Sequence, residues 1–299
     1  MVSAFKKISS HHVETLGIEL EIYQHNRLGT RHCHLACSDT NNTFWVGLST
    51  VPTDSTGVAH ILEHLSLCGS EKYPVRDPFF MMYRRSMAEM NAMTSEDWTA
   101  YYFSTPNKKD FENLLSVYLD AVFFPSLDPL DFKQEGWRLE FENPDDISTD
   151  LCYRGVVYNE MKGALSSPTS RLHGVLSSTL FPTTTYRFES GGDPIDIPKL
   201  TYEQLKDFHR EHYHPSNATF YTYGHIPAST HQVHFEAQVL KRFEQKQSPI
   251  RVPKELTFSQ SVDSHQTYAV SSKSDEGDAT FHVMSWVLGD VTDFHLRLS

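Results

Sequence analysis

Residues 57–67 read Gly57-Val58-Ala59-His60-Ile61-Leu62-Glu63-His64-Leu65-Ser66-Leu67. Their apolar residues recur with a helical period, which predicts an α-helix that begins at Gly57 and ends near Cys68-Gly69-Ser70. At about 100° per residue, His60 and His64 project from one face of this helix, one turn apart. Both imidazoles can therefore reach a single ion, and Glu63 projects beside His64.

This stretch has the order His-x-x-Glu-His, which is the inverted motif of zinc peptidases. Neutral imidazoles and a carboxylate hold Zn²⁺ with one position open for water, and an unligated glutamate takes the proton of that water. The chain has 17 histidines, so a chance match is the alternative. Apolar residues that would bury the helix favour the catalytic interpretation: Val58, Ile61, Leu62 and Leu65.

Further blocks of the chain carry a resemblance to a known family. They are Leu67-Cys-Gly-Ser-Glu-Lys-Tyr-Pro74, Asp77-Pro-Phe-Phe80, Met90-Asn-Ala-Met-Thr94, Tyr118-Leu-Asp-Ala-Val-Phe-Phe-Pro125, Gln134-Glu-Gly-Trp-Arg-Leu-Glu140, Gly155-Val-Val-Tyr-Asn-Glu-Met-Lys-Gly163, Ser190-Gly-Gly-Asp-Pro194 and His212-Tyr-His-Pro-Ser-Asn217. With residues 57–64, they closely resemble the pitrilysin-type (inverzincin) zinc metallopeptidases, and within them the presequence-protease branch. The resemblance implies an α/β fold of the α+β sandwich kind, a sheet covered by helices, followed by the start of a second related domain.

The resemblance also implies roles at the metal. Zinc needs a third protein ligand besides His60 and His64. The family takes it from the Asn-Glu-Met-Lys-Gly block, which here makes Glu160 the ligand. Acidic residues are too numerous for the sequence alone to select this one. We therefore expect one Zn²⁺ per chain on His60, His64 and Glu160, with Glu63 as the general base.

A hairpin predicted from residues 89–94 and 99–104 contains the expected substrate strand. In the resembled family this strand lies at the sheet edge beside the zinc, and Asn91 and Ala92 fall at the matching positions. An extended peptide that pairs with such an edge gains main-chain hydrogen bonds with little sequence preference. A plain buried strand is the alternative.

Other clusters offer weaker alternatives. The stretch His32-Cys33-His34 followed by Cys37 alternates like a half-buried strand, which sends Cys33 and His34 to opposite faces. His209, His212 and His214 form a competing imidazole cluster in a turn-like setting. An acidic run is expected to be a solvated surface: Asp128, Asp131, Glu135, Glu140 and Glu142.

The composition of the chain limits which binding partners and which cellular compartments are expected. A formal net charge of −12 argues against nucleic acid and favours cationic peptides. No stretch approaches the ~20 apolar residues of a membrane span, so no membrane partner is expected. The N-terminus lacks an export signal and is a poor transit peptide, although one could have been removed. The four scattered cysteines indicate reduced thiols. These features suit the cytoplasm of a bacterium or an organelle matrix, and the compartment stays open.

The hydrophobic pattern predicts the remaining elements and a domain boundary. Strands are expected at residues 17–23, 31–37, 43–49, 137–141 and 217–224, and helices at 77–88, 107–123, 129–135, 153–180 with a break around Pro168, and 201–213. Asp77 and Thr201 are expected N-caps. Residues 1–248 would form the zinc-binding peptidase domain. Residues 249–299 would be a linker and the incomplete start of a second domain, with strands at 267–270 and 280–286.

The function implied is a zinc metalloendopeptidase that hydrolyses unfolded peptides, such as cleaved targeting peptides. A catalytically inactive scaffold or fragment of this fold and a zinc hydrolase with a non-peptide substrate are the alternatives. The expected partners are peptide substrates and the missing C-terminal half of the full-length enzyme, which in the family closes over the zinc. The chain by itself is therefore expected to bind zinc but to turn over slowly.

Overall fold

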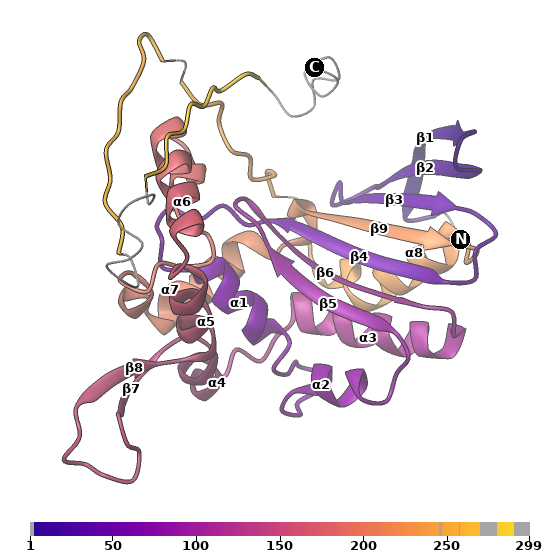
Figure 1. The fold of residues 1–299 in the computed structure, drawn as a ribbon. Helices are drawn as coiled ribbons and strands as arrows, with labels where there is room; N and C mark the ends of the chain where they lie inside the picture. Colours follow the sequence, from indigo (N-terminus) through magenta and orange to yellow (C-terminus); the bar gives the residue numbers. More distant parts are fainter. Residues whose placement is uncertain (1–2, 245–246, 257, 270–279, 290–299) are drawn as a thin grey trace.

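A seven-stranded sheet forms the centre of the computed structural model, which describes residues 3–244, 247–256, 258–269 and 280–289. Its strand order is β1-β2-β3-β9-β4-β6-β5 (Figure 1), and every neighbouring pair is antiparallel except β3 with β9. The strands are β1 (Phe5–Val13), β2 (Ile18–His25), β3 (Arg31–Ala36), β4 (Asn42–Ser49), β5 (Glu89–Thr94), β6 (Trp98–Thr105) and β9 (Ala218–Gly224). The two edges of the sheet are β1 and β5.

Helices and a small ribbon complete the fold. The helices are α1 (Val58–Ser66), α2 (Pro78–Tyr83), α3 (Lys108–Phe123), α4 (Pro129–Glu135), α5 (Val156–Ala164), α6 (Pro168–Leu180), α7 (Tyr202–His212) and α8 (Ala228–Gln238). Single 3-10 turns are η1 (Thr185–Arg187), η2 (Ile197–Lys199), η3 (Pro215–Asn217) and η4 (Leu240–Arg242). The ribbon pairs β7 (Arg138–Phe141) with β8 (Leu151–Arg154). The predicted α/β architecture, a sheet covered by helices, is confirmed.

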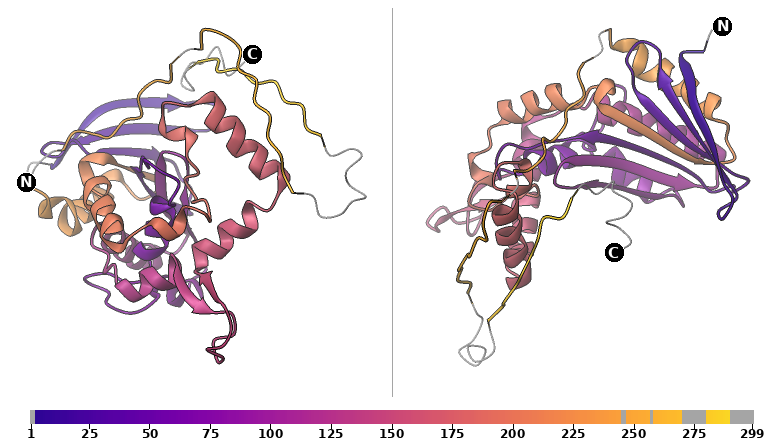
Figure 2. Two further views of the ribbon diagram at one scale, coloured as in Figure 1. Left: turned by 90° about the vertical axis from the view of Figure 1, so that its left-hand side faces the viewer. Right: turned by 90° about the horizontal axis from the view of Figure 1, so that it is seen from above.

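The two faces of the sheet differ in how far helices cover them. Along β4, Phe44, Val46 and Leu48 are buried, and they face the layer formed by α3 and α8. Figure 1 shows these two helices behind the sheet, and the view from above in Figure 2 places the helices on that same side. The alternate residues Thr43 and Trp45 point to the opposite face and are only half-buried. The core therefore lies on one side of the sheet.

Helix α1 lies at one end of the sheet, where it packs against β5 and β6 and against α4 and α7. Its buried side includes Ile61, Leu62 and Leu65, the apolar residues that predicted it. Helices α4, α5 and α6 lie beyond α1 in Figure 1, and the ribbon β7–β8 projects from them. This placement leaves the His60–His64 face of α1 between β5 and α5.

A crossing of glycines joins the start of α1 to residues 190–193. Gly57 and Gly192 have φ of 70° and 104°, which side chains rarely adopt. A Cβ on Gly57 would lie 2.8 Å from the carbonyl oxygen of Gly191. The Asp193 amide also donates to the Ser55 carbonyl at 2.8 Å. Glycine at these positions lets the backbone of this loop approach α1.

Most predicted elements are confirmed, and one of the two expected N-caps, Thr201, is as predicted. The predicted break falls between α5 and α6, at Pro168. Thr201 caps α7 in a capping box with Gln204, and Asn107 caps α3. Asp77 precedes α2 with φ of 53° and makes no side-chain cap hydrogen bond, so that cap is wrong. Helix α2 is also shorter than residues 77–88, because the chain turns at Arg84 and enters β5.

Three elements were not expected from the sequence. Strand β1 is mostly polar, which an edge strand tolerates because only one neighbour pairs with it. Strand β8 includes Tyr153, which the helical pattern had assigned to a helix. Helix α8 buries His231 and Gln232 beside Phe235, so its buried side has no apolar period.

The C-terminal part carries no helix or strand among described residues 247–256, 258–269 and 280–289. The strands predicted at 267–270 and 280–286 are therefore wrong where the structure describes them, because those residues have no ladder partner there; Val270 lies outside the described residues. No helix in the described part of the chain is long and apolar enough to cross a bilayer.

Candidate active site

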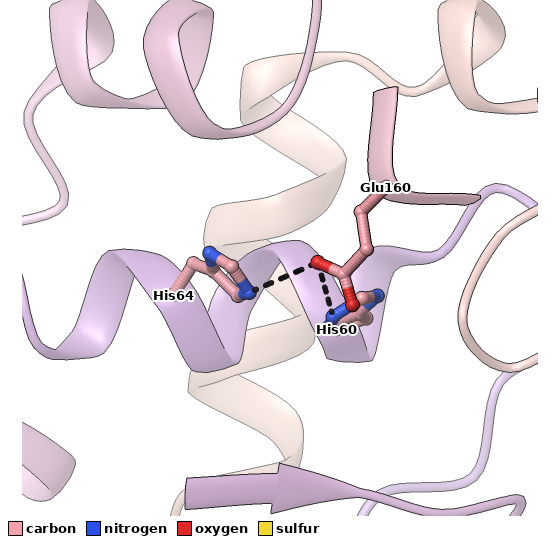
Figure 3. A group of neighbouring side chains, drawn as sticks. All are labelled: His60, His64 and Glu160. Atoms are coloured by element: carbon pink, nitrogen blue, oxygen red, sulfur yellow. Dashed lines mark ion pairs between the residues drawn. The ribbon is translucent and has the colours of Figure 1, made fainter. Parts of the chain in front are cut away.

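His60, His64 and Glu160 come together in the structure (Figure 3). The Glu160 Oε2 atom lies 3.7 Å from His60 Nε2 and 3.9 Å from His64 Nε2. One ligand atom from each residue lies within 4.8 Å of the other two, which suits coordination of one ion. In the described part of the chain, the histidine, cysteine and acidic side chains that are placed so that they could share an ion are these three residues. The predicted trio thus spans α1 and α5.

The second nitrogen of each ring has a partner that fixes its orientation. His60 Nδ1 donates to the Gly191 carbonyl at 3.0 Å, and His64 Nδ1 lies 3.1 Å from the Glu135 carboxylate. Because each Nδ1–H group donates a hydrogen bond to one of these acceptors, the Nε2 atom of each neutral ring carries no proton. Both Nε2 lone pairs therefore face Glu160. This is the outer shell that metal-binding histidines usually have. The donor set fits a zinc ion.

Charge around His64 is mainly negative. Burial lowers the pKa of His64, but the hydrogen bond with Glu135 and the nearby Glu63 and Glu160 carboxylates raise it by more, so its net pKa is above the ordinary value. Burial raises the pKa of Glu135, yet the hydrogen bonds from His64 and Gln134 lower it overall. The surplus of carboxylates favours a cation between them.

Glu63 stands apart from the three converging side chains. It is buried, and its Oε2 accepts a hydrogen bond of 2.6 Å from the Thr94 hydroxyl on β5. Burial raises the pKa of Glu63, opposed by that hydrogen bond and by the two histidines. A carboxylate with a raised pKa beside the trio is suited to accept a proton.

These side chains line one cavity of about 580 Å³. Its walls come from α1, β5, α5 and residues 189–191. Asn91 and Ala92 line it from β5, which is an edge strand, with Asn91 exposed and Ala92 half-buried. The cavity therefore contains the predicted ligands, base and substrate positions together.

Glu135 is a further functional candidate. The acidic run predicts a solvated position for it, and this prediction is wrong, because Glu135 is 9% exposed and contacts His64. Helix α4 packs against α1, and this packing carries Glu135 inward while Asp128 and Glu142 stay exposed. The Gln134–Glu140 block was the available signal, because that block carries part of the resemblance.

The competing clusters have other partners. His209 Nε2 contacts the Val122 carbonyl, His212 Nδ1 contacts the Phe208 carbonyl, and His214 Nδ1 accepts from the Ser216 amide. In β3, His34 is buried while Cys33 is half-buried on the opposite face, as the alternation predicted. These residues are not among the group arranged for a metal in the described part of the chain.

Two models of one peptidase family match the chain. The family model described as insulinase (peptidase family M16) matches residues 45–183, and that of the M16 inactive domain matches residues 199–298. The chain belongs to the M16 peptidase family, as its resemblance to pitrilysin-type enzymes implied.

Within this family the chain is similar to presequence proteases. It is 50% identical over 271 residues to the mitochondrial presequence protease of Mus musculus, covering 90% of the chain and 26% of that protein. It is 52% identical over 219 residues to that of Drosophila melanogaster, covering 73% of the chain and 21% of that protein. The chain thus spans about a quarter of the length of these relatives.

Solved structures share the fold. Pitrilysin superposes with a TM-score of 0.65 at 19% identity, covering 85% of the chain and 26% of pitrilysin. A protease from Helicobacter pylori gives a TM-score of 0.61 at 17% identity, covering 85% of the chain and 54% of that protein. At these identities the similarity supports the fold alone.

Proposed function

We propose that the chain carries the active site of a zinc-dependent endopeptidase, with His60, His64 and Glu160 as the metal ligands and Glu63 as the general base. The observation that supports this most is the convergence of the three donor atoms within 4.8 Å. Both rings have their Nδ1 atoms occupied, and the unligated Glu63 lines the same cavity. Membership in a metallopeptidase family agrees with it.

The chemistry divides between the ion and the chain. Bound zinc would polarise the peptide carbonyl and lower the pKa of a water toward about 7. Glu63 takes the proton of the attacking water and passes it to the leaving amine. The Thr94 hydroxyl holds the Glu63 carboxylate in place, at 2.6 Å. Glu135 and the Gly191 carbonyl hold the two imidazoles.

The substrate we propose is an unfolded peptide that pairs with β5. This strand is an edge of the sheet and lines the cavity, so a peptide added there passes the metal ligands. Asn91 and Ala92 are the proposed contacts. Main-chain pairing demands little sequence preference, and the net charge of −12 favours cationic peptides. The relatives' name, presequence protease, agrees with targeting peptides as the substrate class.

The relatives' greater length bears on activity. We propose that residues 1–248 form the peptidase domain, that residues 249–299 begin a second one, and that a C-terminal half completes the enzyme. Closure of that half would exclude water and add groups that stabilise the developing oxyanion, a contribution of ~3–4 kcal/mol for one donor. The relatives' names place them in mitochondria, and we propose an organelle matrix here as well.

The decisive experiment replaces Glu63 by glutamine and measures zinc content and peptide hydrolysis. The three proposed ligands remain, so zinc should stay stoichiometric while hydrolysis falls by ~10²–10⁴. Glu63 would be a ligand, and our assignment wrong, if this variant lost its zinc. As a matched control, Glu160→Gln should lose zinc as well as activity.

Two alternatives are separated by the unaltered protein. An inactive scaffold would bind zinc without hydrolysing any peptide, even in a form as long as the relatives. A hydrolase for other substrates would show chelator-sensitive turnover of esters but not of peptides. Turnover of residues 1–299 equal to that of the longer form would refute the proposed role of a C-terminal half.

A further inference from the structure

The face of the sheet opposite α3 and α8 carries a row of aromatic side chains. We call it the uncovered face, because in the described part of the chain these two helices pack on the other face. Trp45 on β4 pairs with Tyr102 on β6 and with Tyr221 on β9. Residues paired directly across strands point to one face. Their neighbours Phe44 and Val46 are buried on the opposite face, against the helices, so this row lies on the uncovered face. The strands of Figure 1 present this face toward the viewer.

The rings pack against one another and stay partly exposed. Trp45 meets Tyr221 edge-to-face, with ring centroids 4.8 Å apart and planes at 79°, and Trp98 at 6.1 Å. Gly47 on the same strand gives the Trp45 ring room, because a Cβ there would collide with it. Tyr221 is 39% exposed, and Trp45 and Trp98 are half-buried. We call Trp45, Trp98, Tyr102 and Tyr221 the aromatic platform.

The platform is continuous with the catalytic cavity. The row Trp45–Tyr102 continues to Asn91 on β5, which pairs with Tyr102 and lines the cavity. Met93, the next residue on that face of β5, lines the cavity too and is 40% exposed. A chain leaving the cavity on this side meets aromatic rings.

We propose that the aromatic platform binds apolar side chains in the part of a peptide substrate that lies away from the cleaved bond. This inference rests on the proposed function for its ligand. A peptide paired with β5 becomes the next strand of the sheet, and every second side chain then points to the uncovered face. Rings of tryptophan and tyrosine bind varied apolar groups and tolerate water at their polar ends.

Distance sets the length of peptide that reaches the platform. Strands lie about 4.8 Å apart, so Tyr221, three strands from β5, is about 19 Å from an added strand. An extended chain covers about 3.3 Å per residue, so about six further residues are needed. Short peptides should therefore depend on β5 alone, and long apolar peptides on both regions.

Peptide affinity tests this without turnover. The Glu63→Gln protein, loaded with zinc, is titrated with labelled peptides that share about eight residues, alone or extended by about ten apolar or ten polar residues. Trp45→Thr and Tyr221→Thr remove platform rings, and Leu139→Thr removes an aliphatic side chain of 54% exposure on β7. We expect each platform variant to weaken the apolar long peptide about three- to tenfold. The other two peptides, and the Leu139 variant, should be unaffected.

Several outcomes would overturn the inference. Equal loss for short and long peptides would show a general disturbance of the sheet, and unchanged affinity would show that the rings are not used. In a longer form of the protein, all peptides could bind equally and Trp45 could be shielded from a fluorescence quencher. That result would mean that another part of the chain covers this face. Hydrolysis with no platform effect leaves the proposed function standing. The expected affinities without zinc-dependent hydrolysis would refute the proposed peptidase function and leave the platform as a binding surface for apolar peptides.

Discussion

Two groups of histidines in this molecule have opposite characters. His60 and His64 lie on α1, half-buried, and line the cavity of about 580 Å³. His32, His34 and His231 lie between the sheet and α8, and none is more than 1% exposed. We call the second group, His32, His34 and His231, the buried trio, as distinct from the three residues His60, His64 and Glu160 at the cavity. Both groups bring imidazoles close together, so proximity of histidines does not by itself make a metal site.

The partners of the rings account for the difference. In the buried trio, the Thr222 hydroxyl contacts His32 Nε2 at 2.8 Å and His34 Nδ1 at 2.7 Å, and His231 Nε2 has no partner in the described structure. No carboxylate takes part in these contacts. At the cavity, by contrast, Glu160 and Glu135 flank the imidazoles. A carboxylate that faces both Nε2 atoms, with access to solvent, is what separates this proposed ligand pair from packed histidines.

Burial also sets the charge of the buried trio. It lowers the pKa of all three rings, that of His231 to about 3. His64, with its carboxylate neighbours, has a raised pKa instead. The charged and titratable groups that act on the buried trio from neighbouring elements are Lys7 on β1, Glu21 on β2 and His234 on α8.

The largest difference is expected when one ring is removed from each group of histidines. His64→Ala should lower zinc affinity by more than the ~10–100-fold of an outer-partner change, since it deletes a ligand. His34→Ala should leave zinc binding unchanged and cost about 1–3 kcal/mol of unfolding free energy, since it leaves a buried hydroxyl poorly paired. Zinc titration and denaturant unfolding of both variants measure this. Zinc loss in the His34 variant would erase the distinction.

Acid should act on the buried trio. Because its folded pKa values lie below the unfolded value near 6.5, the unfolded chain binds more protons and stability falls as the pH drops below about 6.5. The loss continues toward about 3 for His231. At pH 5 we expect a loss of about 2 kcal/mol from His231, and further loss in the same direction from His32 and His34. Denaturant unfolding of the zinc-free protein at pH 7 and pH 5 measures it, and equal stabilities would contradict a neutral, buried trio.

The variant Glu135→Gln tests whether the carboxylate beside His64 contributes to zinc affinity. It keeps the shape of the side chain but removes the charge that flanks His64, so zinc affinity should fall ~10–100-fold. Competition with a chelator measures this. Gln134→Glu, on the same helix, is the control for a charge change nearby. Unchanged affinity in the Glu135 variant would mean that the contact with His64 is only structural.

The smallest effect is expected at His231. Its Nε2 is unpaired and its ring lies 5.3 Å from that of Phe111, so His231→Phe should change stability at pH 7 by less than about 1 kcal/mol. The same variant should reduce the acid loss by one histidine's share. An unaltered pH dependence in the unfolding experiment would show that His231 does not contribute to it.

Features that depend on local order along the chain could be predicted from the sequence. Helical spacing brought His60, Glu63 and His64 onto one surface of α1, and the apolar period predicted which side of α1 is buried. Strand alternation predicted β3, β4 and most of the sheet. The resemblance, and not spacing, pointed to Glu160 and to Asn91 and Ala92, and the structure brings all of them to one cavity.

The surroundings of these residues depend on how distant segments pack together. Glu135 reaches His64 from 71 positions away, and Gly191 reaches His60 from 131. Such contacts depend on how α4 and the glycine crossing pack against α1, and no periodicity in the chain encodes them. The uncovered sheet face likewise depends on how the layers assemble. In the sequence, Trp45 on β4 cannot be distinguished from other strand residues, because its neighbours across the sheet, Tyr102 and Tyr221, are known only from the fold.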